Sequence, residues 1–163
     1  MEKLDNFDRS ILRVLQADGK IGNQDLAEKV NLSSSPCWRR VRKLEDSGVI
    51  DSYVAMLNPK SLGLTAMAYV HIALLDHRQK TIETLDNFVA TQDQIIECSS
   101  ITGSNDYLLK IISNDLLSYE SFIKQSFGNL RCVSSIESTV VLKQTFSRQQ
   151  LPLIKTEKKM SFF

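Results

Sequence analysis

The first fifty residues contain three short amphipathic segments separated by polar breaks. Apolar side chains recur every three or four positions in residues 5–17, 23–30 and 36–47, which is the spacing of one face of an α-helix. Asp5 is expected to cap the first helix, and Asn23 the second. The pattern therefore predicts three consecutive helices.

The third predicted helix has the clearest boundaries. Ser35 is a preferred N-cap residue, and Pro36 suits the first helical position because its missing N–H would have no partner there. Gly48 is expected to end the helix. The apolar face consists of Cys37, Val41 and Leu44, with Trp38 at its edge.

The periodicity changes after residue 50. Residues 52–57 are predicted as a short strand, and residues 58–63 have the turn chemistry of a linker. The remaining segments are predicted as strand 64–75, helix 81–90, strand 95–101, strand 107–112, helix 116–127 and strand 133–142. This β-α-β-β-α-β order is the ferredoxin-like arrangement.

The predicted fold class is therefore α+β, in two domains. We expect a helix-turn-helix domain, winged-helix-like, over 1–57, and a linker over 58–63. A ferredoxin-like domain is expected over 64–154, followed by a flexible tail over 155–163. Residues 66–75 are apolar on both faces of their strand, so one face is expected to meet a second subunit.

The charge balance hides a local basic segment. The 163 residues carry 20 basic and 19 acidic side chains, which argues against binding nucleic acid through bulk charge. Residues 36–44, however, hold four basic side chains and no acidic one. Such a run alone is more often a solvated helix face than a binding site.

The context of this basic segment favours DNA binding. Three helices with a polar turn before the third form a helix-turn-helix, whose third helix enters the major groove. Serines at the start of that helix lie where its free N–H groups would approach a phosphate. The predicted DNA-binding residues are Ser33, Ser34, Ser35, Pro36, Arg39, Arg40, Arg42 and Lys43.

Other chemistry is sparse. The three cysteines, Cys37, Cys98 and Cys132, are too far apart in sequence to indicate a disulfide framework or a zinc site. No catalytic triad, phosphate loop or paired carboxylates stand out. The N-terminus does not resemble a signal peptide, and no apolar run reaches the roughly 20 residues of a membrane span. We therefore expect a cytoplasmic protein that is not an enzyme and needs no metal or cofactor.

The turn at residues 102–106 has two interpretations. Its Gly, Asn and Asp satisfy hairpin geometry because they tolerate positive φ. Alternatively, exposed N–H groups beside Gly103 could bind a ligand carboxylate, and Asp106 could meet an ammonium group. An amino acid carries both charges, but the turn alone favours the first interpretation.

Two motifs occur in a fixed order along the chain. The first is Leu32-Ser33-x-x-Pro36-Cys37-x-Arg39-Arg40-Val41-x-Lys43-Leu44-Glu45-x-x-Gly48-Val49-Ile50, continued by Tyr53 and Leu57-Asn58-Pro59. The second is Thr102-Gly103-x-x-Asp106-Tyr107-Leu108-Leu109-Lys110. Together they resemble the Lrp/AsnC family, the leucine-responsive and feast/famine regulators, over about residues 4–146.

The resemblance implies a transcriptional regulator that binds double-stranded DNA and senses a small amino acid such as leucine or methionine. It also implies homodimers that assemble into tetramers or octamers, with the effector bound at an interface between dimers. Arg131-Cys132 stands where the family often has Pro-Gly. The effector-binding residues implied are Ile101, Thr102, Gly103, Ser104 and Asp106, with Thr139, Val140 and Val141 on a second side.

Two other classes stay open on the residues alone. One is a small ferredoxin-like enzyme fused to a helical module, which the missing catalytic groups disfavour. The other is a redox-sensing repressor that acts through Cys37. A Cys37→Ser variant that still lost DNA binding on oxidation would dismiss the second.

Overall fold

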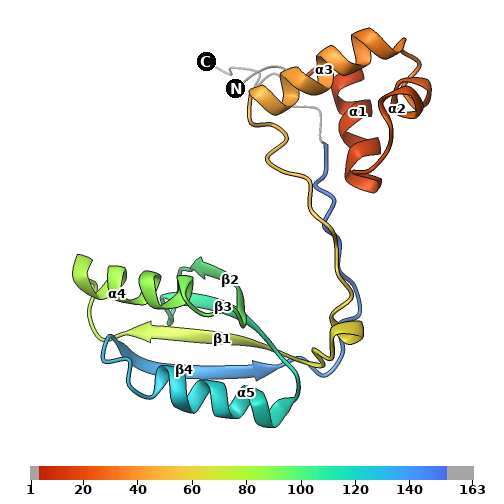
Figure 1. Cartoon of the computed structure of the whole chain (residues 1–163). Coiled ribbons are helices and arrows are strands. Elements are labelled where there is room, and N and C mark those ends of the chain that lie inside the picture. The colour runs from red at the N-terminus through yellow and green to blue at the C-terminus, as the bar shows by residue number, and fades with distance from the viewer. Residues whose placement is uncertain (1–3, 154–163) are drawn as a thin grey trace. The chain divides into compact units, whose positions relative to one another are not determined.

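The computed structural model describes residues 4–153, which form two compact units (Figure 1). The first unit combines residues 4–56 with residues 146–153, and the second spans Leu57–Thr145. The linker predicted over 58–63 thus falls inside the second unit, where residues Pro59–Leu62 form the short 3₁₀ helix η1. Residues 146–153, which were expected in the ferredoxin-like domain over 64–154, belong to the first unit instead.

The first unit contains the three predicted helices around one apolar core. They are α1 (Asn6–Ala17), α2 (Asn23–Lys29) and α3 (Ser34–Asp46). Each contributes one apolar face, so burial rather than propensity holds these short helices together. The buried core residues are Ile11, Leu12, Leu26, Ala27, Val30, Cys37 and Leu44.

Two of the predicted N-caps are wrong. Gly22 caps α2, while Asn23 is already helical and its side-chain amide donates to the Ser34 carbonyl at 3.1 Å. Ser33, not Ser35, caps α3, which places Pro36 at the third helical position. Proline fits there because the first four helical N–H groups have no intrahelical acceptor.

The predicted C-terminus of α3 is confirmed at Gly48. This glycine has φ of 69° and its N–H donates to the Glu45 carbonyl at 2.9 Å. The following N–H, of Val49, donates to the Leu44 carbonyl at 3.0 Å. These two bonds form a Schellman motif, which needs the left-handed backbone that glycine adopts without strain.

The strand predicted over 52–57 is absent, since the structure shows irregular and exposed chain there. No other segment of the described first unit is a strand, so 52–57 has no partner with which to pair. Tyr53 is held instead by its hydroxyl, which donates to the Glu45 carboxylate at 3.0 Å. Partial burial and this carboxylate together raise the pKa of Tyr53 to about 12.

The C-terminal segment packs on α1. The Gln16 amide pairs with the backbone of Leu151, whose N–H donates to Oε1 at 2.6 Å and whose carbonyl accepts from Nε2 at 3.3 Å. Gln150 donates to the Gln16 carbonyl at 3.4 Å, and Leu153 packs against the core of the first unit. The predicted flexible tail over 155–163 lies outside the described residues.

The second unit has the predicted ferredoxin-like arrangement (Figure 1). Its strands form one antiparallel sheet in the order β2-β3-β1-β4. One helix joins β1 to β2, and the other joins β3 to β4 and ends in the π-helical turn η2. The elements are β1 (Ala66–Leu74), α4 (Gln79–Ala90), β2 (Ile95–Ser100), β3 (Tyr107–Ser113), α5 (Leu116–Phe122), η2 (Ile123–Phe127) and β4 (Val133–Val140).

The helices cover a single face of this sheet. Leu85 of α4, Tyr119 of α5 and Phe127 of η2 share one core with Val70 and Ile72 of β1. Alternate β1 residues therefore face the helices and are buried. The intervening side chains of β1, which lie on the opposite face and are partly exposed, are Met67, Tyr69, His71 and Ala73.

Candidate DNA-binding and effector sites

The outer surface of α3 is polar and basic. Ser34, Ser35, Arg39, Arg42 and Lys43 are exposed on it, while Cys37 and Leu44 hold the opposite side of the helix in the core. Ser33 is exposed at the N-cap, and Pro36 is partly buried. Seven of the eight predicted DNA-binding residues therefore lie at the start of α3 or on its basic surface.

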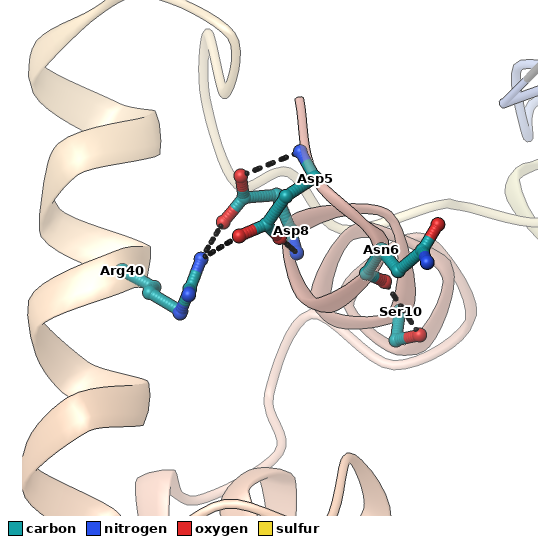
Figure 2. A network of polar contacts seen from close by, with 5 residues as sticks. All are labelled: Asp5, Asn6, Asp8, Ser10 and Arg40. Atoms are coloured by element: carbon teal, nitrogen blue, oxygen red, sulfur yellow. Dashed lines mark hydrogen bonds and ion pairs between the residues drawn. The ribbon is translucent and has the colours of Figure 1, made fainter. Parts of the chain in front are cut away.

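Arg40 differs from the other basic residues of α3. Its Nη1 lies 2.7 Å from the Asp5 carboxylate and 2.7 Å from the Asp8 carboxylate (Figure 2). Its guanidinium carbon also lies 5.4 Å from the centre of the Phe7 ring. Arg40 thus binds the start of α1, a role that sequence reasoning missed because the two carboxylates are more than thirty positions away.

The same two carboxylates cap α1. Asp5 accepts from the Asp8 N–H at 2.8 Å, and Asp8 accepts from the Asp5 N–H at 3.0 Å. Each carboxylate uses one oxygen for the cap and the other for Arg40 (Figure 2). The Asp8 N–H, helped by Arg40, lowers the pKa of Asp5. One cluster of charges therefore joins a helix start to the basic helix.

Arg42 is oriented by its own helix. Its guanidinium carbon lies 5.8 Å from the centre of the Trp38 ring, and its Nη1 lies 3.7 Å from the Glu45 carboxylate. Trp38 was predicted at the edge of the buried face, yet it is 56% exposed. Residue spacing places Trp38 at the boundary between the buried and the exposed face of α3. In the structure, Trp38 is not among the residues of the apolar core of the first unit.

The turn between β2 and β3 is the first half of the implied effector site. Thr102, Gly103 and Ser104 are exposed, and Gly103 has φ of 123°, a backbone that other residues rarely adopt. Ile101 donates its N–H to the Asp106 carbonyl at 2.9 Å, which closes the turn. The exposed part offers a small ligand backbone N–H groups and two hydroxyls.

The Asp106 carboxylate is engaged within the turn region. One oxygen accepts from the Leu74 N–H at 2.7 Å, and the other lies 2.7 Å from Nε2 of His77. These bonds lower the pKa of Asp106, and the carboxylate in turn raises the pKa of His77. Sequence reasoning missed His77 because its partner is 29 positions away.

The second half of the implied effector site lies elsewhere in the same chain. Thr139 pairs with Tyr69 and Val140 with Ala68, whereas Asp106 donates its N–H to the Ile72 carbonyl. At about 3.3 Å per residue, the two groups lie roughly 13 Å apart along β1. Within one chain the two groups therefore lie at separate positions along the sheet.

Within residues 4–153, no helix is long and apolar enough to cross a membrane. Nor do those residues include a group of three His, Cys, Asp or Glu side chains placed to hold a metal ion. A helix-turn-helix with a basic outer surface, followed by a ferredoxin-like domain, is typical of a DNA-binding regulator.

Comparison with known proteins names the family. Residues 4–51 match winged helix-turn-helix DNA-binding domains, and residues 67–151 match the Lrp/AsnC ligand binding domain. The chain is 36% identical over 153 residues to the leucine-responsive regulatory protein of Escherichia coli (strain K12), covering 94% of this chain and 93% of that one. It is 34% identical over 142 residues to the proline dehydrogenase transcriptional activator of Rhizobium radiobacter, covering 87% and 91%.

Solved structures agree. A transcriptional regulator from Neisseria meningitidis, crystallised with L-methionine, superposes with a TM-score of 0.89 at 33% identity, covering 93% of this chain and 97% of that one. A feast or famine regulatory protein from M. tuberculosis, complexed with L-methionine, gives 0.78 at 29% identity, covering 91% and 98%. The chain belongs to the Lrp/AsnC family of transcriptional regulators and is not an enzyme.

Proposed function

We propose that the exposed surface of α3 reads operator DNA, and that an amino acid bound to the second unit changes how well it does so. The observation that carries the proposal is the basic surface of α3, on which Arg39, Arg42 and Lys43 lie outside the core. Arginine can bond guanine in the major groove, and lysine can neutralise phosphates. Because Cys37 and Leu44 hold the opposite side of α3 in the core, this basic surface is left exposed to a ligand.

The DNA-binding surface is tested with Arg39→Ala and Lys43→Ala. Each should weaken binding to a duplex that the wild-type protein selects from a random library. Loss of one phosphate contact should also reduce the slope of log affinity against log salt by about one. Fluorescence anisotropy across a salt series measures both quantities.

The control for this test is Lys80→Ala, which removes an exposed charge from α4 in the second unit. It should bind the duplex as the wild type does. Unchanged affinity and salt slope in both α3 variants would contradict the proposal.

We propose the exposed turn 102–104 as the first half of the effector site. Its support is the exposed backbone around Gly103 together with the L-methionine complexes of the two structural relatives. Asp106 contributes by holding the turn in place, since its carboxylate already bonds Leu74 and His77. Residues 139–141 of another copy would supply the second half.

The effector site is tested by a thermal-shift screen of the twenty amino acids. Thr102→Val and Ser104→Ala remove hydroxyls without forcing a side chain into the Gly103 backbone, and each should weaken the response to the best ligand. Ser121→Ala, on the exposed surface of α5, is the matched control. A full response in both turn variants would place the ligand elsewhere.

We propose that the functional form is a homodimer joined through the uncovered sheet face, assembling further into tetramers or octamers in the cytoplasm. A two-fold dimer presents two recognition helices to a pseudo-palindromic operator. Ligand binding at an interface between copies then shifts the equilibrium between assemblies, because it favours the assembly that completes its site.

A further inference from the structure

Trp38 is unusual for its position. It is the only tryptophan of the chain and belongs to the second turn of α3. It is 56% exposed, although tryptophan is on average a highly buried residue. It takes no part in the apolar core of the first unit, either as a buried or as a partly buried member. Packing within the unit therefore does not explain this large apolar side chain.

The surroundings of Trp38 point to DNA rather than to an apolar partner. Arg39 follows it in sequence and Arg42 lies one helical turn further on, and both are exposed. The Arg42 guanidinium carbon lies 5.8 Å from the centre of the indole ring. A partner that covers Trp38 must also accept two positive charges, which a nucleic acid does and an apolar protein surface does not.

We propose that Trp38 contacts a base pair directly and contributes to operator specificity, an inference that rests on the proposed binding of DNA by α3. The indole ring has an apolar edge, and the apolar group displayed in the major groove is the thymine methyl. Trp38 also limits the freedom of Arg42 by lying under its guanidinium, which prepares that side chain to bond guanine. The pair therefore reads a thymine close to a guanine.

The intrinsic fluorescence of the full-length protein tests this inference, because Trp38 is the sole indole fluorophore. Titration with the selected duplex should change its emission in proportion to binding measured independently by anisotropy. Trp38→Leu should lower affinity for the selected duplex about tenfold and affinity for random DNA little, so the specificity ratio falls.

Replacing single thymines by uracil in the duplex removes one methyl group at a time. One position should cost the wild-type protein a few-fold in affinity and cost Trp38→Leu nothing, because the partner of that methyl is already lost. A merely structural role of Trp38 would not produce this coupling to one base.

The matched control is Phe146→Leu. Phe146 is also an exposed aromatic residue under an arginine, with the Arg148 guanidinium carbon 5.3 Å from its ring centre, but it lies outside α3. This variant should keep the wild-type specificity ratio.

Three results would overturn the inference while leaving the proposed function intact. The first is DNA binding without any change in tryptophan emission, and the second is an unchanged specificity ratio in Trp38→Leu. The third is an emission that changes with protein concentration but not with added DNA. The last would show that a second copy covers Trp38. Complete absence of DNA binding in the wild type would instead overturn the proposed function and, with it, the inference.

Discussion

At the scale of single residues, the ion pairs of Arg40 show that this residue stabilises the first unit, whereas its neighbour Arg39 is left for DNA recognition. Arg40 binds Asp5 and Asp8, whereas Arg39 forms no ion pair within the part of the chain that the structure describes. Two arginines that are neighbours in sequence therefore have different partners. The geometry of the helix causes this difference, because successive residues are rotated by about 100° around its axis. Arg40 therefore points toward α1 and Arg39 points away from it.

We predict that Arg40→Ala lowers the free energy of unfolding of the first unit by about 1–2 kcal/mol, because two carboxylates lose a shared partner. Urea denaturation followed by circular dichroism measures the loss. Under conditions where the variant is folded, its DNA affinity should keep the wild-type salt slope. A stability equal to that of the wild type would show that water replaces the guanidinium without cost.

The His77–Asp106 pair predicts a pH dependence. The pKa of His77 is raised above its ordinary 6.5, so its contribution to stability is complete below that pH and is lost as pH rises through the raised value. The pKa of Asp106 is lowered from 3.8, so its contribution is present above 3.8 and is lost as pH falls through the lowered value.

The melting temperature of the wild type should therefore exceed that of His77→Gln most clearly between the two ordinary pKa values, 3.8 and 6.5. The difference should shrink as the solution becomes alkaline. Thermal melts of both proteins from pH 4 to pH 9 provide the comparison. A difference that stays constant over this range would mean that the pair does not stabilise the turn.

At the scale of elements, the end of α3 depends on one backbone conformation. A Cβ on Gly48 would meet no atom within 4 Å, so space is not the constraint there. The constraint is the φ of 69°, which is strained for most residues that carry a Cβ. Gly48→Ala should therefore destabilise the first unit by about 1 kcal/mol, and Gly48→Asn by less, since asparagine tolerates this region. Chemical denaturation of both variants ranks them.

Apolar periodicity predicted every helix of the first unit and the order of strands and helices in the second. It succeeded because a helix face and a strand face have different periods, and both must be buried. It failed for residues 52–57, a run of apolar residues for which the described part of the first unit offers no partner strand. It also placed the start of α3 near Ser35, because three consecutive serines are all good caps and only the fold selects Ser33.

The candidate sites were predictable only in part. Spacing on a helical wheel was enough to place Arg39 and Lys43 on the outer surface of α3. It could not show that Arg40 is bound by Asp5 and Asp8, that Asp106 is bound by His77, or that Trp38 is exposed. Each of these outcomes depends on a contact, or a missing contact, between distant parts of the chain.

At the scale of the whole molecule, the C-terminal segment belongs to the first unit. We predict that Gln16→Ala, which removes two hydrogen bonds to Leu151, accelerates amide exchange in α1. Leu153→Ala should act in the same direction through lost packing, at a cost of about 1–2 kcal/mol. Hydrogen exchange measured by mass spectrometry locates the effect. Gln149→Ala, exposed in the same segment, is the control.

The uncovered sheet face predicts how copies associate. Met67 lies on it opposite Ile112 of β3, while Lys110 and Glu97 form an ion pair of 2.8 Å on neighbouring strands. Met67→Lys should reduce the mass of the assembly in native mass spectrometry. It would place an unpaired positive charge in the proposed interface, beside the Lys110–Glu97 ion pair. Leu117→Lys, exposed on α5 on the helical side, should not reduce that mass. A dimer that survives Met67→Lys would have another interface.

Because residues 4–56 and 146–153 both belong to the first unit, the second unit is an insertion in the topological sense. Exchanging ligand-binding domains between relatives therefore requires two junctions, near residues 56 and 146, rather than a single crossover in the linker. A chimera made with one junction would give α1 a foreign C-terminal segment. A change in its DNA binding could then come from a damaged DNA-binding domain rather than from altered ligand specificity, even if every effector contact had been transferred correctly.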